Sequence, residues 1–200
     1  PAPPEPKSGS RILAERLKFP DFVPPAVVLP HGKVGNSPSG MACDMTKGKW
    51  GPWANQMFVG EQTASQVQRV NLEVVNGLYQ GAVFHFLQGF EAGLVPVRMD
   101  QEDGTLFIGG TNRGWGSRGS QPFTFERVRY KGTVPFEMHN ISARSDGFEV
   151  TFTHPVDAAT AADTASYSMD AFTYIYQSSY GSPEVDQAKP TVKSATVSAD

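Results

Sequence analysis

From Pro25 onward, apolar residues recur in short runs or at every second position, and turn-forming residues separate the runs. This spacing is typical of β-strands with one face on a core. We expect an all-β chain with strands at 26–29, 40–43, 56–60, 66–72, 82–87, 94–99, 105–109, 123–130, 137–143, 147–153, 166–169, 172–177 and 191–197. Residues 11–18 favour two helical turns that Pro20 ends, and residues 157–165 favour a short helical turn.

Two of the expected strand pairs repeat in the sequence. Residues 56–61 (QMFVGE) precede 67–70 (VQRV), and residues 105–110 (TLFIGG) precede 125–128 (FERV). Phe58 and Phe107 are 49 residues apart. A repeat of about 40–50 residues with roughly four short strands is typical of β-propeller blades, whose sheets bury their faces against one another. The repeat therefore predicts two blades within residues 25–134.

The composition changes after Tyr130. Residues 146–200 hold eight acidic residues and only two lysines, and Asp146-Gly147 is a common hairpin turn between two of the expected strands. We therefore divide the chain into a Pro-rich lead-in with a short helix (1–24), propeller blades (25–134) and an immunoglobulin-like β-sandwich cut short at its end (135–200). We expect the chain to be a piece of a longer polypeptide.

Composition and charge exclude several classes of protein. The formal net charge of −3 does not suit a protein that binds the phosphate backbone of nucleic acids. One cysteine cannot form an internal disulfide, and the four histidines lie too far apart in sequence for a local metal site. The longest nearly apolar run, residues 24–30, is far shorter than the ~20 residues of a membrane-spanning helix.

The chain resembles the C-terminal propeller blades of glucose/sorbosone dehydrogenase-like proteins and the immunoglobulin-like module that follows them. The stretches that carry the resemblance are 50–62 (WGPWANQMFVGEQ), 106–119 (LFIGGTNRGWGSRG) and 135–138 (PFEM) for the blades, and 147–152 (GFEVTF) and 180–186 (YGSPEVD) for the trailing module. The resemblance to the blades extends over about residues 25–140. The resemblance is to large secreted bacterial proteins that are often fused to c-type cytochrome domains.

The resemblance implies a periplasmic or extracellular location and relatives that oxidise sugars with pyrroloquinoline quinone and calcium. Where the quinone enzymes carry a pair of arginines before an inner strand, this sequence has residues 89–93 (GFEAG), and no lysine lies within residues 60–66. We therefore expect no cofactor and no metal within this chain. Quinone and calcium are expected only in a longer parent protein, so the chain is expected to be a portion that is not catalytic on its own.

Candidate binding residues come from loops that open on one face of an up-and-down blade. These loops are 61–63, 88–93 and 111–121, and the candidates are Glu61, Arg113, Trp115 and Arg118. Arginine offers paired donors to carboxylates or phosphates, and tryptophan offers a flat face to a sugar ring. An architectural loop, in which the glycines permit turns and the arginines pair with acids, is the alternative.

Two further functions remain open from the sequence. The first is a structural or docking subunit of a larger periplasmic or membrane-associated electron-transfer complex, because isolated blades leave sheet edges and faces uncovered. The second is a carbohydrate-binding module, for which Trp115 supplies the stacking surface. The expected partners are therefore missing propeller blades, a larger complex or a c-type cytochrome.

Overall fold

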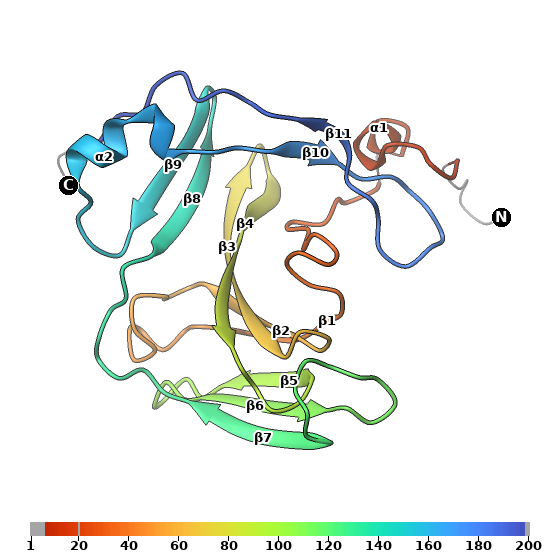
Figure 1. Cartoon of the computed structure of the whole chain (residues 1–200), viewed down its shortest axis with the longest axis vertical. Helices are drawn as coiled ribbons and strands as arrows, with labels where there is room; N and C mark the ends of the chain where they lie inside the picture. Colours follow the sequence, from red (N-terminus) through yellow and green to blue (C-terminus); the bar gives the residue numbers. More distant parts are fainter. Residues whose placement is uncertain (1–6, 20, 199–200) are drawn as a thin grey trace. The chain divides into compact units, whose positions relative to one another are not determined.

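The computed structural model describes residues 7–19 and 21–198, and this part of the chain is mainly antiparallel β-structure (Figure 1). Its strands form four sheets, and none of them closes into a barrel. The expectation of an all-β chain is confirmed. Within the described ranges, no helix is long and apolar enough to cross a membrane.

The chain divides into two compact units. The central unit runs from Pro25 to His154, and the terminal unit combines Pro1–Pro24 with Pro155–Asp200. The central unit thus continues beyond residue 134, where the sequence places the end of the blades. Each unit is described by itself below.

The central unit contains two antiparallel sheets whose strands follow one another in sequence order (Figure 1). The first sheet has the order β1 (Pro38–Cys43), β2 (Met57–Glu61), β3 (Gln66–Val75) and β4 (Leu78–Gln88). The second sheet has the order β5 (Leu94–Met99), β6 (Leu106–Thr111) and β7 (Phe123–Val128). Consecutive strands pair directly in both sheets, because antiparallel neighbours need no crossover connection.

The sequence repeat corresponds to a repeat of strand pairing. Phe58 of β2 lies opposite Arg69 of β3, and Phe107 of β6 lies opposite Arg127 of β7. The first strand pair of each sheet also changes register at the same place, after Pro38 in β1 and after Leu94 in β5. The two sheets are therefore two copies of one structural motif.

The core lies between the two sheets. Glycines bring the backbones close: a Cβ on Gly60 would lie 2.8 Å from Val97 Cγ2, and one on Gly40 would lie 2.4 Å from the Val95 carbonyl oxygen. The Ser39 hydroxyl donates to the Leu94 carbonyl across the same contact (2.9 Å). The buried cluster consists of Trp50, Trp53, Phe58, Val67, Phe90, Leu94, Val97, Leu106 and Ile108.

A two-stranded hairpin, β8 (Met138–Arg144) and β9 (Gly147–Phe152), also belongs to the central unit. Arg69 of β3 holds it: the guanidinium donates to the carbonyls of Met138 (2.7 Å) and His139 (2.8 Å). The same guanidinium lies 4.1 Å from the ring centroid of Trp53 and 4.2 Å from that of Phe84. A buried cation therefore ties the hairpin to the first sheet.

The terminal unit has little regular structure. Its elements are α1 (Ile12–Arg16), α2 (Ala158–Ala162), the 3-10 turn η1 (Thr164–Ser166), β10 (Ala171–Thr173) and β11 (Val185–Ala188). Asp157 caps α2 by accepting from the Thr160 N–H, and Arg11 forms an ion pair with Asp186 (2.6 Å). β10 and β11 pair as a two-stranded antiparallel sheet.

Three of the expected strands are absent. Residues 26–29, 166–169 and 191–197 have no strand pairing, and β11 was not expected. Prolines flank the first of these segments and remove N–H donors that a sheet would need. At the second segment, Asp163 accepts from the Ala165 N–H and starts a 3-10 turn. The expected lead-in falls partly on residues 1–6, which lie outside the described residues.

Candidate functional site

The structure brings together the three loops that the sequence predicts on one face (61–63, 88–93 and 111–121). With residues 64 and 65 included, we call them the loop rim (residues 61–65, 88–93 and 111–121). The Arg118 N–H donates to the Thr63 carbonyl (2.8 Å), and the Gln121 N–H donates to the Glu91 carbonyl (2.9 Å). The Gly119 N–H donates to the Ser65 hydroxyl (2.9 Å). The long loop of the second sheet is therefore fastened to both other loops.

Asn112 folds the long loop from within. Its side-chain oxygen accepts from the Gly93 N–H (3.0 Å), and its side-chain nitrogen donates to the carbonyls of Gly119 (2.7 Å) and Gln121 (2.8 Å). A Cβ on Gly119 would lie 2.4 Å from the Glu91 carbonyl, so a larger residue does not fit there. The shape of the loop is fixed by these contacts.

A pocket of about 310 Å³ opens within the loop rim and is lined by Ala64, Ser65, Gly89, Phe90, Glu91, Arg118, Gly119 and Ser120. Phe90 is buried and supplies an apolar surface. Among the described residues, neither the Arg118 guanidinium nor the Glu91 carboxylate has a hydrogen-bond or ion-pair partner. The pocket thus offers one cation, one anion and an aromatic ring, a combination that suits a small hydroxylated or acidic ligand.

The four sequence candidates have different environments. Arg118 lines the pocket, whereas Arg113 and Trp115 lie on the exposed part of the long loop, with the Trp115 side chain 78% exposed. Glu61 is fully buried and faces away from solvent. Its carboxylate accepts from the backbone N–H groups of Asn36 (2.9 Å), Ser37 (2.5 Å) and Ala64, so Glu61 shapes the loop rim.

Sequence reasoning missed three residues of the pocket: Ser65, Phe90 and Glu91. Phe90 and Glu91 lie in the loop 88–93 that the blade geometry indicates, but no motif singles them out. Ser65 has a φ of 52°, and its hydroxyl also donates to Ser117 Oγ (3.0 Å). The role of such a hydroxyl can be recognised only when its partners, Ser117 and Gly119, are known, because they are distant in the sequence.

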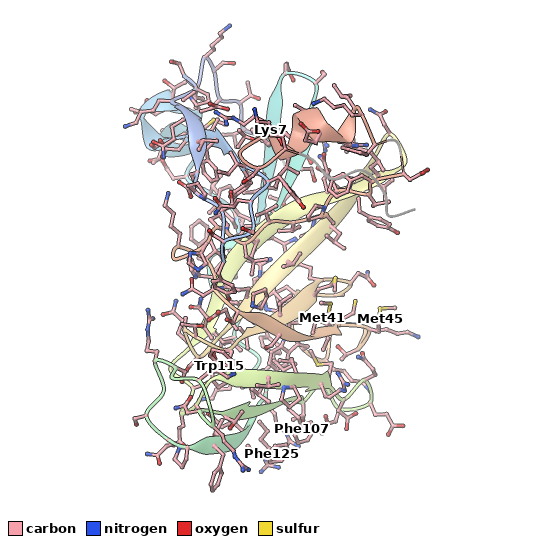
Figure 2. All side chains as sticks on the ribbon, turned by 90° about the vertical axis from the view of Figure 1, so that its right-hand side faces the viewer. Lys7, Met41, Met45, Phe107, Trp115 and Phe125 are labelled. Carbon is pink, nitrogen blue, oxygen red and sulfur yellow. The ribbon has the colours of Figure 1, made fainter. Side chains whose placement is uncertain are left out.

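A second surface of interest is the outer side of the second sheet, which we call the open face (Arg98, Phe107, Phe123, Phe125 and Arg127). Phe107 and Phe125 stack with ring centroids 5.9 Å apart, and both are labelled in Figure 2. Phe123 and Phe125 are strongly exposed. Three aromatic rings therefore lie on a surface that the rest of the central unit does not cover.

The repeat shows how unusual this surface is. Val67 and Phe125 occupy equivalent positions, opposite Gly60 and Gly109 respectively, yet Val67 is 0% exposed and Phe125 is 77% exposed. Arg69 and Arg127 are likewise equivalent, and Arg69 is buried whereas Arg127 is exposed. The second sheet packs on Val67, whereas Trp53 and the hairpin β8–β9 cover Arg69. Nothing in the central unit covers the equivalent positions of the second sheet.

Within the described residues there is no group of three or more His, Cys, Asp and Glu side chains placed to hold a metal ion.

We find no match to this chain among protein-family models, among curated proteins or among solved structures.

Proposed function

We propose that this chain is a non-catalytic portion of a secreted sugar dehydrogenase-like β-propeller, and that it docks onto further β-sheets through the open face. The observation that carries the proposal is the exposure of Phe125 and Arg127 at positions whose counterparts in the first sheet are buried. Contiguous exposed aromatic residues mark interaction surfaces in soluble proteins. The docking partner is a missing blade or a subunit of a larger periplasmic complex.

The arrangement of the sheets supports a propeller. Both sheets run in sequence order, repeat the same register and pack face against face, as neighbouring blades do. If a third sheet packs on the second as the second packs on the first, it covers Phe107 and Phe125, the counterparts of Phe58 and Val67. We further propose that residues 135–200 correspond to the immunoglobulin-like module that follows the blades in such proteins.

The docking role can be tested with surface variants of the 200-residue chain. We expect the wild type to bind the dye ANS and to self-associate in sedimentation experiments, because two exposed phenyl rings lie side by side on β7. Replacing both with serine (Phe123→Ser with Phe125→Ser) is expected to reduce dye binding and association. Both side chains are exposed, so we expect the stability to change little.

Phe148→Ser is the matched control, since Phe148 is an exposed phenylalanine of β9 that lies off the open face. An equal effect of Phe148→Ser, or a wild type that stays monomeric and binds no dye, contradicts docking through this surface. Intact mass and an absorption spectrum of the protein from its natural source then separate the two partners. A longer chain with quinone or haem absorbance supports a missing blade, and a short chain within a complex supports a docking subunit.

A second candidate function is the binding of a sugar or sugar acid in the loop rim. The unpartnered Arg118 and Glu91 side chains in one pocket favour it, and they provide both signs of charge that a hydroxylated acid recognises. We expect gluconate to shift the NMR signals of the rim backbone, and Arg118→Ala to abolish the shift. Arg144→Ala, an arginine outside the rim, is the control. If Trp115→Ala leaves binding intact, Trp115 is not part of the site.

A further inference from the structure

Soft sulfur ligands are concentrated at one place on the first sheet. Met41, Cys43, Met45 and Met57 are three of the six methionines of the chain and its single cysteine. Met41 and Cys43 belong to β1, Met45 follows that strand, and Met57 begins β2. We call these four residues the sulfur cluster. It lies outside both the loop rim and the open face.

Strand register places three members of the sulfur cluster, Met41, Cys43 and Met57, on one side of the sheet. Cys43 and Met57 are direct partners across the β1–β2 pair, so their side chains lie on the same face. Met41 is two residues before Cys43 in the same strand and shares that face. Long side chains reach a diagonal neighbour across a strand pair, which brings Met41 within reach of Met57.

The closest sulfur atoms already have the spacing of two ligands on one metal ion. Cys43 Sγ lies 3.8 Å from Met45 Sδ. Two sulfur atoms that each bind a metal at about 2.3 Å lie roughly 3.8–4.0 Å apart in tetrahedral or trigonal geometry. Little rearrangement is therefore needed for both atoms to bind one ion.

A neighbouring side chain holds the backbone between these two sulfur residues. Gln101 donates from its amide nitrogen to the Cys43 carbonyl (2.9 Å), and its amide oxygen accepts from the Met45 N–H (2.8 Å). One planar amide thus fixes both residues, although Gln101 lies in the turn after β5. A ligand pair that is held in place in this way loses less conformational freedom when it binds.

The methionines are not packed as core residues. Met41 is 52% exposed and Met45 is 58% exposed, and Figure 2 labels both on the outer part of the first sheet. Gap filling in a core, which is the usual role of methionine, does not explain these positions. An ion from solvent can reach both thioethers.

We propose that the sulfur cluster is a binding site for Cu(I), with Cys43 and Met45 as the first ligands and Met41 and Met57 completing the coordination. One thiolate with thioethers is a soft ligand set, which selects Cu(I) over magnesium, calcium and other hard cations. The site needs no residue of the loop rim and does not depend on the proposed function. Binding converts the thiol and Cu(I) into a copper thiolate and one released proton.

The test is a competition for Cu(I) between the 200-residue chain and the colorimetric chelator bicinchoninate, without oxygen. We expect the wild type to withdraw one copper ion per chain, and X-ray absorption to show sulfur ligands. Cys43→Ser and Met45→Leu are each expected to lower the affinity at least about tenfold, the lower end of what a disturbed metal shell costs. Circular dichroism checks that each variant keeps its β-structure.

Met138→Leu is the matched control, because Met138 is 45% exposed and lies on β8, away from the sulfur cluster. The site is supported if Met138→Leu keeps the wild-type affinity for Cu(I) and Met45→Leu loses affinity. Failure of the wild type to compete with bicinchoninate overturns it. So does a triple variant, Met41→Leu with Met45→Leu and Met57→Leu, that binds as tightly as the wild type, because the cysteine alone then accounts for binding.

Discussion

At the residue scale, Arg69 is the largest fully buried side chain among the described residues. It is 1% exposed, it lies between the rings of Trp53 and Phe84, and burial lowers its pKa to about 10 despite the Glu137 carboxylate 3.9 Å away. At neutral pH the guanidinium therefore remains a cation. Backbone carbonyls and ring faces compensate for the lost hydration, as a buried charge requires.

We expect Arg69→Ala to destabilise the central unit by about 3 kcal/mol, since it leaves the Met138 and His139 carbonyls and the Gln56 side chain without their charged donor. Urea unfolding followed by tryptophan fluorescence measures the change, because Trp53 contacts the guanidinium. Arg127→Ala removes the equivalent but exposed arginine and is expected to cost less than about 0.5 kcal/mol. Equal costs for the two variants contradict the role given to Arg69.

At the element scale, β3 contacts the hairpin β8–β9 at several positions along its length. Arg69 binds its start, Asn71 donates to the Asn140 side chain (2.5 Å), and Glu73 accepts from the Ala143 N–H (2.9 Å). These three residues alternate along β3, so they lie on one face of the sheet. The hairpin is therefore attached along its length by polar contacts.

The hydrogen bond from the Ala143 N–H holds the pKa of Glu73 below its ordinary value of 4.5, with the Gln80 amide contributing second. This contact is fully present above pH 4.5 and is lost as the pH falls through the lowered pKa, because only the carboxylate accepts strongly. We expect the NMR shift of the Ala143 amide to titrate below pH 4.5, and Glu73→Gln to remove that titration. An inflection that persists in Glu73→Gln assigns it to another group.

At the scale of the whole molecule, the stability of the described residues is concentrated in the central unit. The buried hydrophobic residues of the described ranges all lie within residues 50–108. Nine of them form one cluster with members from both sheets, and the glycines at the contact between the sheets let the backbones approach. The same stacking leaves the last sheet with an uncovered aromatic side, which is why we assign docking to the open face.

Much of this architecture can be predicted from the sequence. β5 begins and ends where the pattern places it, and β2, β3, β6 and β9 lie within a few residues of their expected bounds. The convergence of the loop rim also follows from strand order. Alternation of apolar and polar residues, and the length of a connection, are local properties of the chain, so they can be recognised before any contact is known.

The roles of individual side chains cannot be predicted in this way, because they depend on contacts that form only in the folded chain. Glu61 is expected at the rim and is buried, and Arg69 and Arg127 share a motif but not an environment. The pairing of Cys43 with Met57 depends on register across two strands. The strands and their repetition can thus be recognised from local sequence, whereas the covered faces become known only from packing, because burial depends on residues that are distant in the chain.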